Sequence, residues 1–213
     1  MKGIILDKNL EAVFSDALQD WVNNIERYTN EFDNNDTLYY YNERATVSTL
    51  AASLYKSGYF ILEEFSTNKS VDGEVKTGRV DLFFAKDVYG LTKSYFGAVV
   101  EAKQVYVNLS DNYNGSMAIK TSFSKAEQDT INSFNKQYHT NSYAITFIVP
   151  KVKFKDKEYS KERCKNLITE IQELNEHHGI AYIFPKKCEL CYETYFYPGI
   201  ICLIKEIKHS SFN

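Results

Sequence analysis

The order of hydrophobic and polar residues predicts two helices in the first sixty residues. Residues 9–30 place apolar side chains at three- and four-residue steps, the spacing of an amphipathic helix. These positions are Leu10, Val13, Phe14, Leu18, Trp21, Ile25 and Tyr28. A polar connection, NEFDNND, follows, and the stretch NERATVSTLAASLYKSGY then predicts a second helix that begins near residue 42 and closes at Gly58.

Three runs rich in aromatic and β-branched residues come next and predict strands. They are YFILEEF (59–65), RVDLFFA (79–85) and YFGAVVEAKQVYV (95–107), separated by the polar segments STNKSVDGEVKTG and KDVYGLTK, which we interpret as connections. This arrangement is typical of an antiparallel meander.

The second half alternates between helical and strand patterns. We expect a helix over 122–137, a strand over 142–149, a helix near 159–176 and a strand over 180–184, whereas YPGIICLIKEIK (197–208) fits either a strand or a helix. The alternation predicts an α/β fold with a central mixed sheet flanked by helices.

Length and composition favour a single folded domain. The chain has 213 residues, of which 44% are hydrophobic, enough for one core. No apolar run approaches the about 20 residues of a membrane helix, and MKGIILDKNL is charged too early for a signal peptide, so we expect a cytoplasmic protein with no membrane partner. The net charge of −3 carries no overall basic signature for nucleic acid, although residues 151–165 are locally basic.

Two of the predicted strands carry charged residues among apolar ones. Because side chains alternate along a strand, Glu101 and Lys103 share a face with each other, and Asp81 shares its face with Arg79 and Phe83. If the strands are neighbours, Asp81 approaches Glu101. Two close carboxylates repel unless a cation lies between them, and Mg²⁺ prefers such oxygen ligands. With a lysine beside them, the three residues suit metal-dependent phosphodiester hydrolysis.

Glu-x-Lys triplets are common, and the chain contains three, beginning at Glu74, Glu101 and Glu206. The triplet at Glu101 is the one that ends a long apolar strand and follows, at hairpin distance, another strand with a lone aspartate. The alternative interpretation is structural, in which each acid forms a salt bridge with Lys103 or Arg79.

This arrangement resembles the PD-(D/E)XK nuclease superfamily, also called restriction-endonuclease-like, over roughly residues 42–150. The resemblance implies that Asp81, Glu101 and the backbone carbonyl of Ala102 bind Mg²⁺ or Mn²⁺ and that Lys103 positions the attacking water. It also implies that Glu43 completes the metal site, for which the structural alternative is a helix N-terminal acid favoured by the dipole. The family's proline before the first acid is replaced here by Val80.

Three further residues are candidate nucleic-acid contacts by the same resemblance. Gln104 follows the lysine directly, and Gln128 and Lys125 lie on the next predicted helix. The alternative is that these are ordinary exposed side chains, which are common at strand ends and on helices.

The resemblance favours DNA as substrate, in restriction or another anti-invader role first and in repair second. We expect residues 1–41 and 151–213 to extend a catalytic core of 42–150, and loops such as 104–121 to supply specificity. Cleavage of both strands needs two sites, which favours a homodimer, and the N-terminal helix is a candidate interface for a second copy or another protein. The alternatives are a non-catalytic nucleic-acid- or protein-binding module on the same fold and an RNase or structure-selective nuclease.

Cysteine and histidine motifs suggest little chemistry. Cys188 and Cys191 have zinc-ligand spacing but form half a site, so we expect reduced thiols. His177 and His178 follow a predicted helix and precede Gly179. A histidine near a helix C-terminus interacts favourably with the helix dipole, so we expect these residues to cap the helix.

Overall fold

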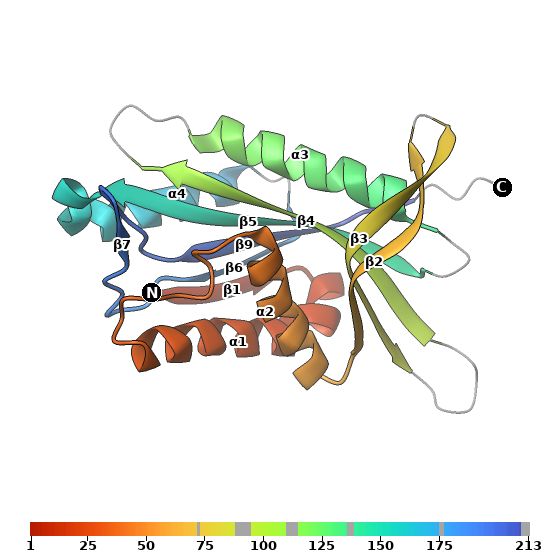
Figure 1. The fold of residues 1–213 in the computed structure, drawn as a ribbon, viewed down its shortest axis with the longest axis horizontal. Helices are drawn as coiled ribbons and strands as arrows, with labels where there is room; N and C mark the ends of the chain where they lie inside the picture. Colours follow the sequence, from red (N-terminus) through yellow and green to blue (C-terminus); the bar gives the residue numbers. More distant parts are fainter. Residues whose placement is uncertain (72, 88–94, 110–114, 136–138, 175–176, 210–213) are drawn as a thin grey trace.

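The order of strands in the central sheet places sequence-distant segments side by side (Figure 1). The structure is a computed structural model that describes residues 1–71, 73–87, 95–109, 115–135, 139–174 and 177–209. Within these residues nine strands form one sheet. Its main path runs β1 (Lys2–Leu6), β6 (Gly179–Ile183), β9 (Ile200–Glu206), β5 (Asn141–Lys153), β4 (Tyr95–Asn108), β3 (Glu74–Asp87) and β2 (Phe60–Val71).

Strand directions make the sheet mixed. β4 and β5 are parallel, and every other neighbouring pair on the path is antiparallel. A short hairpin of β7 (Cys191–Tyr192) and β8 (Tyr195–Phe196) attaches to the end of β5. The predicted meander of β2, β3 and β4 is confirmed.

Helices cover both faces of the sheet (Figure 1). α1 (Lys8–Glu31) and α2 (Glu43–Lys56) lie on one face, while α3 (Gly115–Ser133) and α4 (Ser160–Glu173) lie on the other, with a 3-10 turn, η1 (Phe154–Tyr159), before α4. Each face has its own apolar cluster, so the sheet lies between two layers of helix. The predicted α/β class with a central mixed sheet and flanking helices is confirmed.

Local capping explains where the first two helices begin and end. Asp7 and Asn42 are the N-caps, and their side-chain oxygens accept hydrogen bonds of 2.9 Å from the backbone N–H groups of Leu10 and Ala45. Gly58 follows the end of α2 with φ of +88°, a left-handed conformation that glycine adopts without steric cost. The capping fixes Glu43 at the first position of α2.

The apolar stripe of α1 is part of the main core. Leu10, Phe14, Leu18, Trp21 and Ile25 are each fully buried against the sheet. The predicted amphipathic helix is confirmed, but the face that we expected to meet a second copy or another protein is covered by the protein's own strands.

Several segments differ from the expectation. The segment 66–78 is not a loose connection but the outer half of a long β2–β3 hairpin, and the tail at 197–208 contributes the inner strand β9. The sequence pattern missed the short edge strand β1. Most of the connection expected at 86–93 lies outside the described residues.

The expected specificity loop at 104–121 is mostly regular structure. Residues 104–108 continue β4 and residues 115–121 open α3, while 110–114 lie outside the described residues. The regions 1–41 and 151–213, expected as extensions, supply β1, β6 and β9 to the same sheet as the central region. Among the described residues, no helix combines the length and apolar content needed to cross a bilayer.

The aromatic cluster around Phe84 predicts a large stability effect. Phe84 is fully buried and its ring lies 5.1–6.1 Å from those of Phe14, Tyr59, Phe96 and Tyr143. Phe84→Ala should therefore lower the free energy of unfolding by about 3–5 kcal/mol in urea denaturation.

The matched control is Phe60→Ala on the neighbouring strand, because Phe60 is 72% exposed and should change stability by no more than about 0.5 kcal/mol. Equal effects of the two substitutions would contradict this account of the core.

Candidate active site

The candidate site lies where β3 and β4 separate. The two strands pair from Asp87↔Tyr95 to Leu82↔Val100, and beyond that point β3 stays with β2 while β4 stays with β5. We call this opening the fork. In Figure 1 the β2–β3 hairpin bends away from the sheet here. Past the fork, one edge of β4 has no strand partner on the β3 side.

Two carboxylates take the place of the missing strand. The Asp81 Oδ2 atom accepts a hydrogen bond of 2.8 Å from the backbone N–H of Ala102, and the Glu43 Oε2 atom accepts one of 2.7 Å from the N–H of Gln104. Buried backbone N–H groups need partners, so both acids complete the hydrogen bonding of the β4 edge. They are also fixed in place beside it.

The predicted sharing of faces is confirmed. Leu82 of β3 and Val100 and Ala102 of β4 belong to the apolar cluster beneath α1 and α2. Because side chains alternate, Glu101 and Lys103 project from the opposite face, where they contact Ser133 and Asp129 of α3, while Asp81 lies at the edge of β4 between them and Glu43. The structure thus brings together the three residues that the sequence selected.

Glu101 is the most buried acid of the group. It is 2% exposed, and its Oε1 atom accepts hydrogen bonds from the Lys69 ammonium at 2.6 Å and from the Ser133 hydroxyl. Burial, followed by repulsion from Asp81, raises the pKa of Glu101 to about 7, against the opposing effects of Lys69 and Ser133.

Lys69 reaches Glu101 from the outer part of the β2–β3 hairpin. Its aliphatic stem crosses Gly78 on β3, where an added Cβ would lie 2.7 Å from the Lys69 Cδ atom. Because Gly78 has no side chain, the stem of Lys69 has room to cross β3 at this position. The alternative of a satisfied salt bridge holds for Glu101, although its partner is Lys69 and not Lys103 or Arg79.

Lys103 lies between an acid of α3 and the edge of its own strand. Its Nζ atom is 2.8 Å from the Asp129 Oδ2 atom and donates to the Ala102 carbonyl at 3.0 Å. Burial lowers the pKa of Lys103, but the hydrogen bond and charge of Asp129, followed by the charges of Asp81 and Glu43, outweigh burial and raise the pKa above its usual value. The lysine is therefore a cation held near three carboxylates.

Glu43 faces a hollow on the other side of the fork. Burial is the largest cause of its raised pKa, the Gln104 N–H and Lys103 oppose the rise, and the charge of Asp81 adds to it. Glu43 and Asp81 both line this hollow of about 300 Å³, together with Asn42, Arg44, Val47 and Glu64. The two acids thus share a solvent space as well as a strand edge.

The hollow is bordered by a charged network centred on Glu64. Arg44 donates to both carboxylate oxygens of Glu64, at 3.0 and 3.3 Å, and Arg79 donates at 2.7 Å. Glu64 lies opposite Asp81 in the strand register and has φ of +53°, a left-handed conformation that is costly for glutamate. Strained residues cluster at functional sites, and this one lies next to the candidate acid.

The three predicted nucleic-acid contacts are placed differently from one another. Gln104 lies at the fork, where its side chain accepts from the Thr46 hydroxyl at 2.7 Å and donates to the Tyr106 hydroxyl at 3.0 Å. Gln128 and Lys125 are exposed on α3, and Gln128 donates to Asn132 at 3.1 Å. On this helix it is Asp129, the residue after Gln128, that contacts Lys103.

Sequence reasoning missed four residues of the site: Lys69, Asp129, Ser133 and Glu64. Asp129 and Ser133 are four positions apart and therefore lie on adjacent turns of one helix face, a spacing that the sequence displays. Lys69 carried no such signal, because the polar segment around it was interpreted as a connection.

The donor atoms at the fork match the chemistry of a hard divalent cation only in part. Among the described residues, no group of three His, Cys, Asp or Glu side chains is arranged to hold a metal ion. The available donors are the carboxylates of Asp81 and Glu101 and the carbonyl of Ala102. Mg²⁺ commonly uses one or two carboxylates together with water and substrate phosphate, so the set fits that ion.

The cysteine and histidine motifs lie away from the fork. Cys188 is buried, with its thiol donating to the Tyr197 carbonyl at 3.3 Å, whereas Cys191 is exposed, and both are free thiols. The Nδ1 atom of His178 accepts a hydrogen bond of 3.1 Å from the backbone N–H of Glu206, which ties this segment to β9.

The raised pKa of Glu101 predicts a specific pH dependence of stability. Between about pH 4.5 and pH 7 the folded protein holds a proton on Glu101 that the unfolded chain has released, so stability falls as pH rises through this window. In EDTA, native protein should lose up to about 3 kcal/mol more than Glu101→Gln between pH 4.5 and pH 8, measured by urea denaturation.

The control is Glu173→Gln on the exposed end of α4, which should keep the native pH dependence. A Glu101→Gln curve parallel to the native curve would show that Glu101 ionises normally.

Comparisons of the chain with protein-family models, with curated proteins and with solved structures found no match. The resemblance to the PD-(D/E)XK nucleases therefore rests on the residues of the fork and on their order along the chain.

Proposed function

We propose that the protein is a divalent-metal-dependent nuclease with a restriction-endonuclease-like core, and that the fork is its active site. The observation that carries the proposal is that Asp81, Glu101 and Lys103 lie close together where two strands separate. Two mutually repelling carboxylates beside a lysine are the groups that phosphodiester hydrolysis with a bound cation requires.

In the proposed mechanism, Asp81, Glu101 and the Ala102 carbonyl hold Mg²⁺ or Mn²⁺. The bound ion would polarise a phosphoryl oxygen and lower the pKa of a coordinated water. Asp81 is already fixed by the Ala102 N–H, which limits the movement needed to reach this arrangement. Lys69 contacts the Oε1 atom of Glu101, so the other carboxylate oxygen of Glu101 would be the one to face the cation.

Lys103 would act on the water and the phosphate. Its Nζ atom has three protons and, among the described residues, contacts Asp129 and the Ala102 carbonyl, so the third proton would serve an attacking water or a phosphate oxygen. A fixed ammonium stabilises the negative charge that develops as the water oxygen bonds to phosphorus and the P–O bond to the leaving group breaks. Asp129 is proposed as the residue that orients Lys103.

The proposed substrate is nucleic acid, with DNA first and RNA as the alternative, and the proposed context is restriction or another defence against invading DNA. Arg44 and Arg79, both exposed at the rim of the fork, supply positive charge beside the hollow. A single fork cuts one strand at a time, so cleavage of both strands at one position would involve a homodimer.

Cleavage assays test the catalytic part of the proposal. Native protein with Mg²⁺ or Mn²⁺ should cut supercoiled plasmid, linear duplex or single-stranded DNA, and EDTA should abolish cutting. Lys103→Ala and Asp81→Ala should lose roughly 10²- to 10⁴-fold in rate, because each removes a group that acts on the reacting phosphate.

The control for these assays is Lys165→Ala, which removes an exposed lysine of α4 and should cut at the native rate. Nicked circles as the main plasmid product would indicate monomers, and linear product a dimer. Equal cutting by native protein and Lys103→Ala would contradict the proposed role of the lysine.

A second candidate function, a non-catalytic binding module, is favoured by one observation. Lys69 already supplies a positive charge to Glu101, so the buried acid is compensated without a metal.

Metal binding distinguishes the two functions. Calorimetry at pH 8 should detect Mg²⁺ or Mn²⁺ binding to native protein and to Asp16→Ala, whose aspartate is exposed on α1, and should detect at least tenfold weaker binding to Asp81→Ala. The same heat for native protein and Asp81→Ala would favour the binding module.

A further inference from the structure

A group of tyrosines lies next to the fork on the side of α2. We call Tyr40, Tyr41, Tyr106, Tyr192 and Tyr197 the tyrosine patch. The Tyr40 ring lies 5.8 Å from Tyr41, 5.7 Å from Tyr192 and 5.1 Å from Tyr197, and Tyr106 lies 6.3 Å from Tyr197. Four separate parts of the chain contribute these rings: the segment before α2, β4, β7 and the segment before β9.

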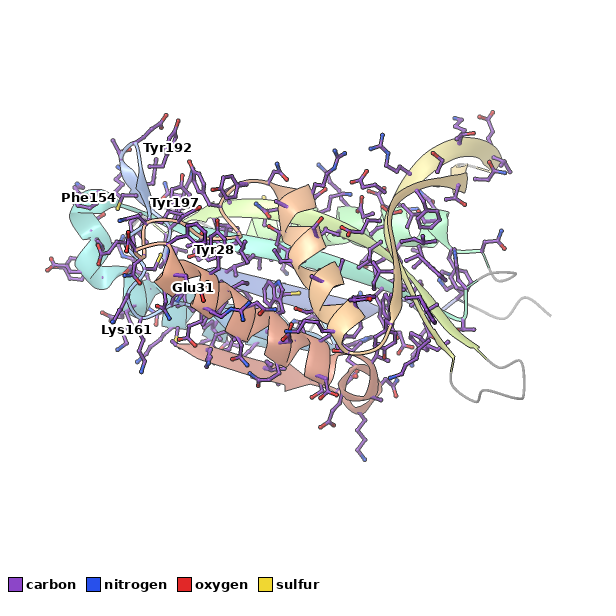
Figure 2. The ribbon with its side chains drawn as sticks, turned by 60° about the horizontal axis from the view of Figure 1, so that its bottom comes forward. Tyr28, Glu31, Phe154, Lys161, Tyr192 and Tyr197 are labelled. Atoms are coloured by element: carbon purple, nitrogen blue, oxygen red, sulfur yellow. The ribbon has the colours of Figure 1, made fainter. Side chains whose placement is uncertain are left out.

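The patch combines buried support with exposed rings. Tyr197 is 7% exposed and forms its base, whereas Tyr41 and Tyr192 are 56% and 54% exposed. The Tyr41 hydroxyl donates to Asp36 at 2.8 Å, which holds its ring in place. Figure 2 shows Tyr192 and Tyr197 at the same end of the molecule as Phe154. Large exposed rings supported by other rings are pre-arranged to stack on a flat partner.

Hydrogen bonds join the patch to the candidate site. The Gln104 amide donates to the Tyr106 hydroxyl at 3.0 Å, and that hydroxyl donates to the Tyr40 carbonyl at 2.7 Å. The backbone N–H of Gln104 is the group that donates to Glu43. Gln104 therefore contacts both the patch, through Tyr106, and an acid of the fork, Glu43.

Charge around the patch favours a single strand over a duplex. Lys151 lies 4.5 Å above the ring of Tyr195, the partner of Tyr192 in the β7–β8 hairpin, and Arg44 lies at the fork end. Asp36 and Glu193 border the same surface, so it is not the dense basic face that a duplex backbone requires. Stacking on rings with a few cations nearby is the mode by which proteins bind unpaired bases.

We propose that the tyrosine patch binds unpaired nucleotides of a nucleic-acid strand and leads that strand to the fork, so that the substrate is single-stranded or carries a single-stranded end. This inference rests on the proposed nucleic-acid substrate. Bases stack on the exposed rings of Tyr41 and Tyr192, with Lys151 at the β7–β8 end of the patch and Arg44 at the fork end.

The test measures binding separately from cutting. In EDTA, fluorescence anisotropy compares a labelled 12-nucleotide thymidine strand with an abasic strand of the same length and charge and with a 12-base-pair blunt duplex. The thymidine strand should bind at least tenfold more tightly than either of the others. A uridine strand of equal length separates DNA from RNA.

Variants assign the binding to the patch. Tyr192→Ala and Tyr41→Ala should each weaken binding of the thymidine strand about tenfold, Tyr192→Phe should retain it, and Tyr55→Ala, which removes a tyrosine 69% exposed on α2, should leave it unchanged. Melting temperatures check that each variant is folded. Because Tyr41 also contacts Asp36, Tyr41→Phe separates loss of the ring from loss of that hydrogen bond.

Equal binding of the thymidine and abasic strands, or an unchanged affinity in both alanine variants, would overturn the inference. Cutting assays with Mg²⁺ keep the two proposals apart. Stacking without cutting would reject the nuclease and retain the patch, whereas cutting that requires Lys103 but is unaffected by Tyr192→Ala and Tyr41→Ala would retain the nuclease and reject the patch.

Discussion

The candidate site depends on one constraint, the backbone hydrogen bonding of β4 after it leaves β3. A strand in the middle of a sheet cannot leave its N–H groups unpaired, and β4 is bonded to β5 on its other side. Asp81 and Glu43 satisfy the N–H groups of Ala102 and Gln104. The opening between the strands therefore needs hydrogen-bond acceptors at its edge, and the hydrogen bonds that satisfy the strand also fix the positions of two carboxylates.

Charge at the fork is balanced in pairs. Glu101 is compensated by Lys69, Lys103 by Asp129, and Glu64 by Arg44 and Arg79. Burial of an uncompensated charge would cost several kcal/mol, so these ion pairs allow the seven ionisable groups to lie within one region.

The parts of the fold with strong periodicity could be predicted from the sequence. The apolar stripe of α1 and the apolar runs of β2, β3, β4 and β5 identified these elements, and alternation along β4 correctly placed Glu101 and Lys103 on one face. Lys69 could not be predicted, because the outer hairpin has no buried face and hence no pattern. Asp129 could not be separated from Gln128, since the rotation of α3 is fixed by its packing on the sheet rather than by its own sequence.

The position of β9 has a consequence for how the chain folds as it is synthesised. β9 pairs with both β5 and β6, and β6 in turn holds β1, so the strand that joins the two halves of the sheet is made after every other strand that the structure describes. Until residues 200–206 emerge, β5 has an open edge and the pair of β1 and β6 is not attached to the rest of the sheet. Contacts of such long sequence separation form slowly, and the unfinished edge must be protected from pairing with other chains. A chain truncated before β9 would lack a stable sheet, and with it a fixed fork, so an incomplete protein would carry the acids and the lysine of the candidate site without the scaffold that brings them together.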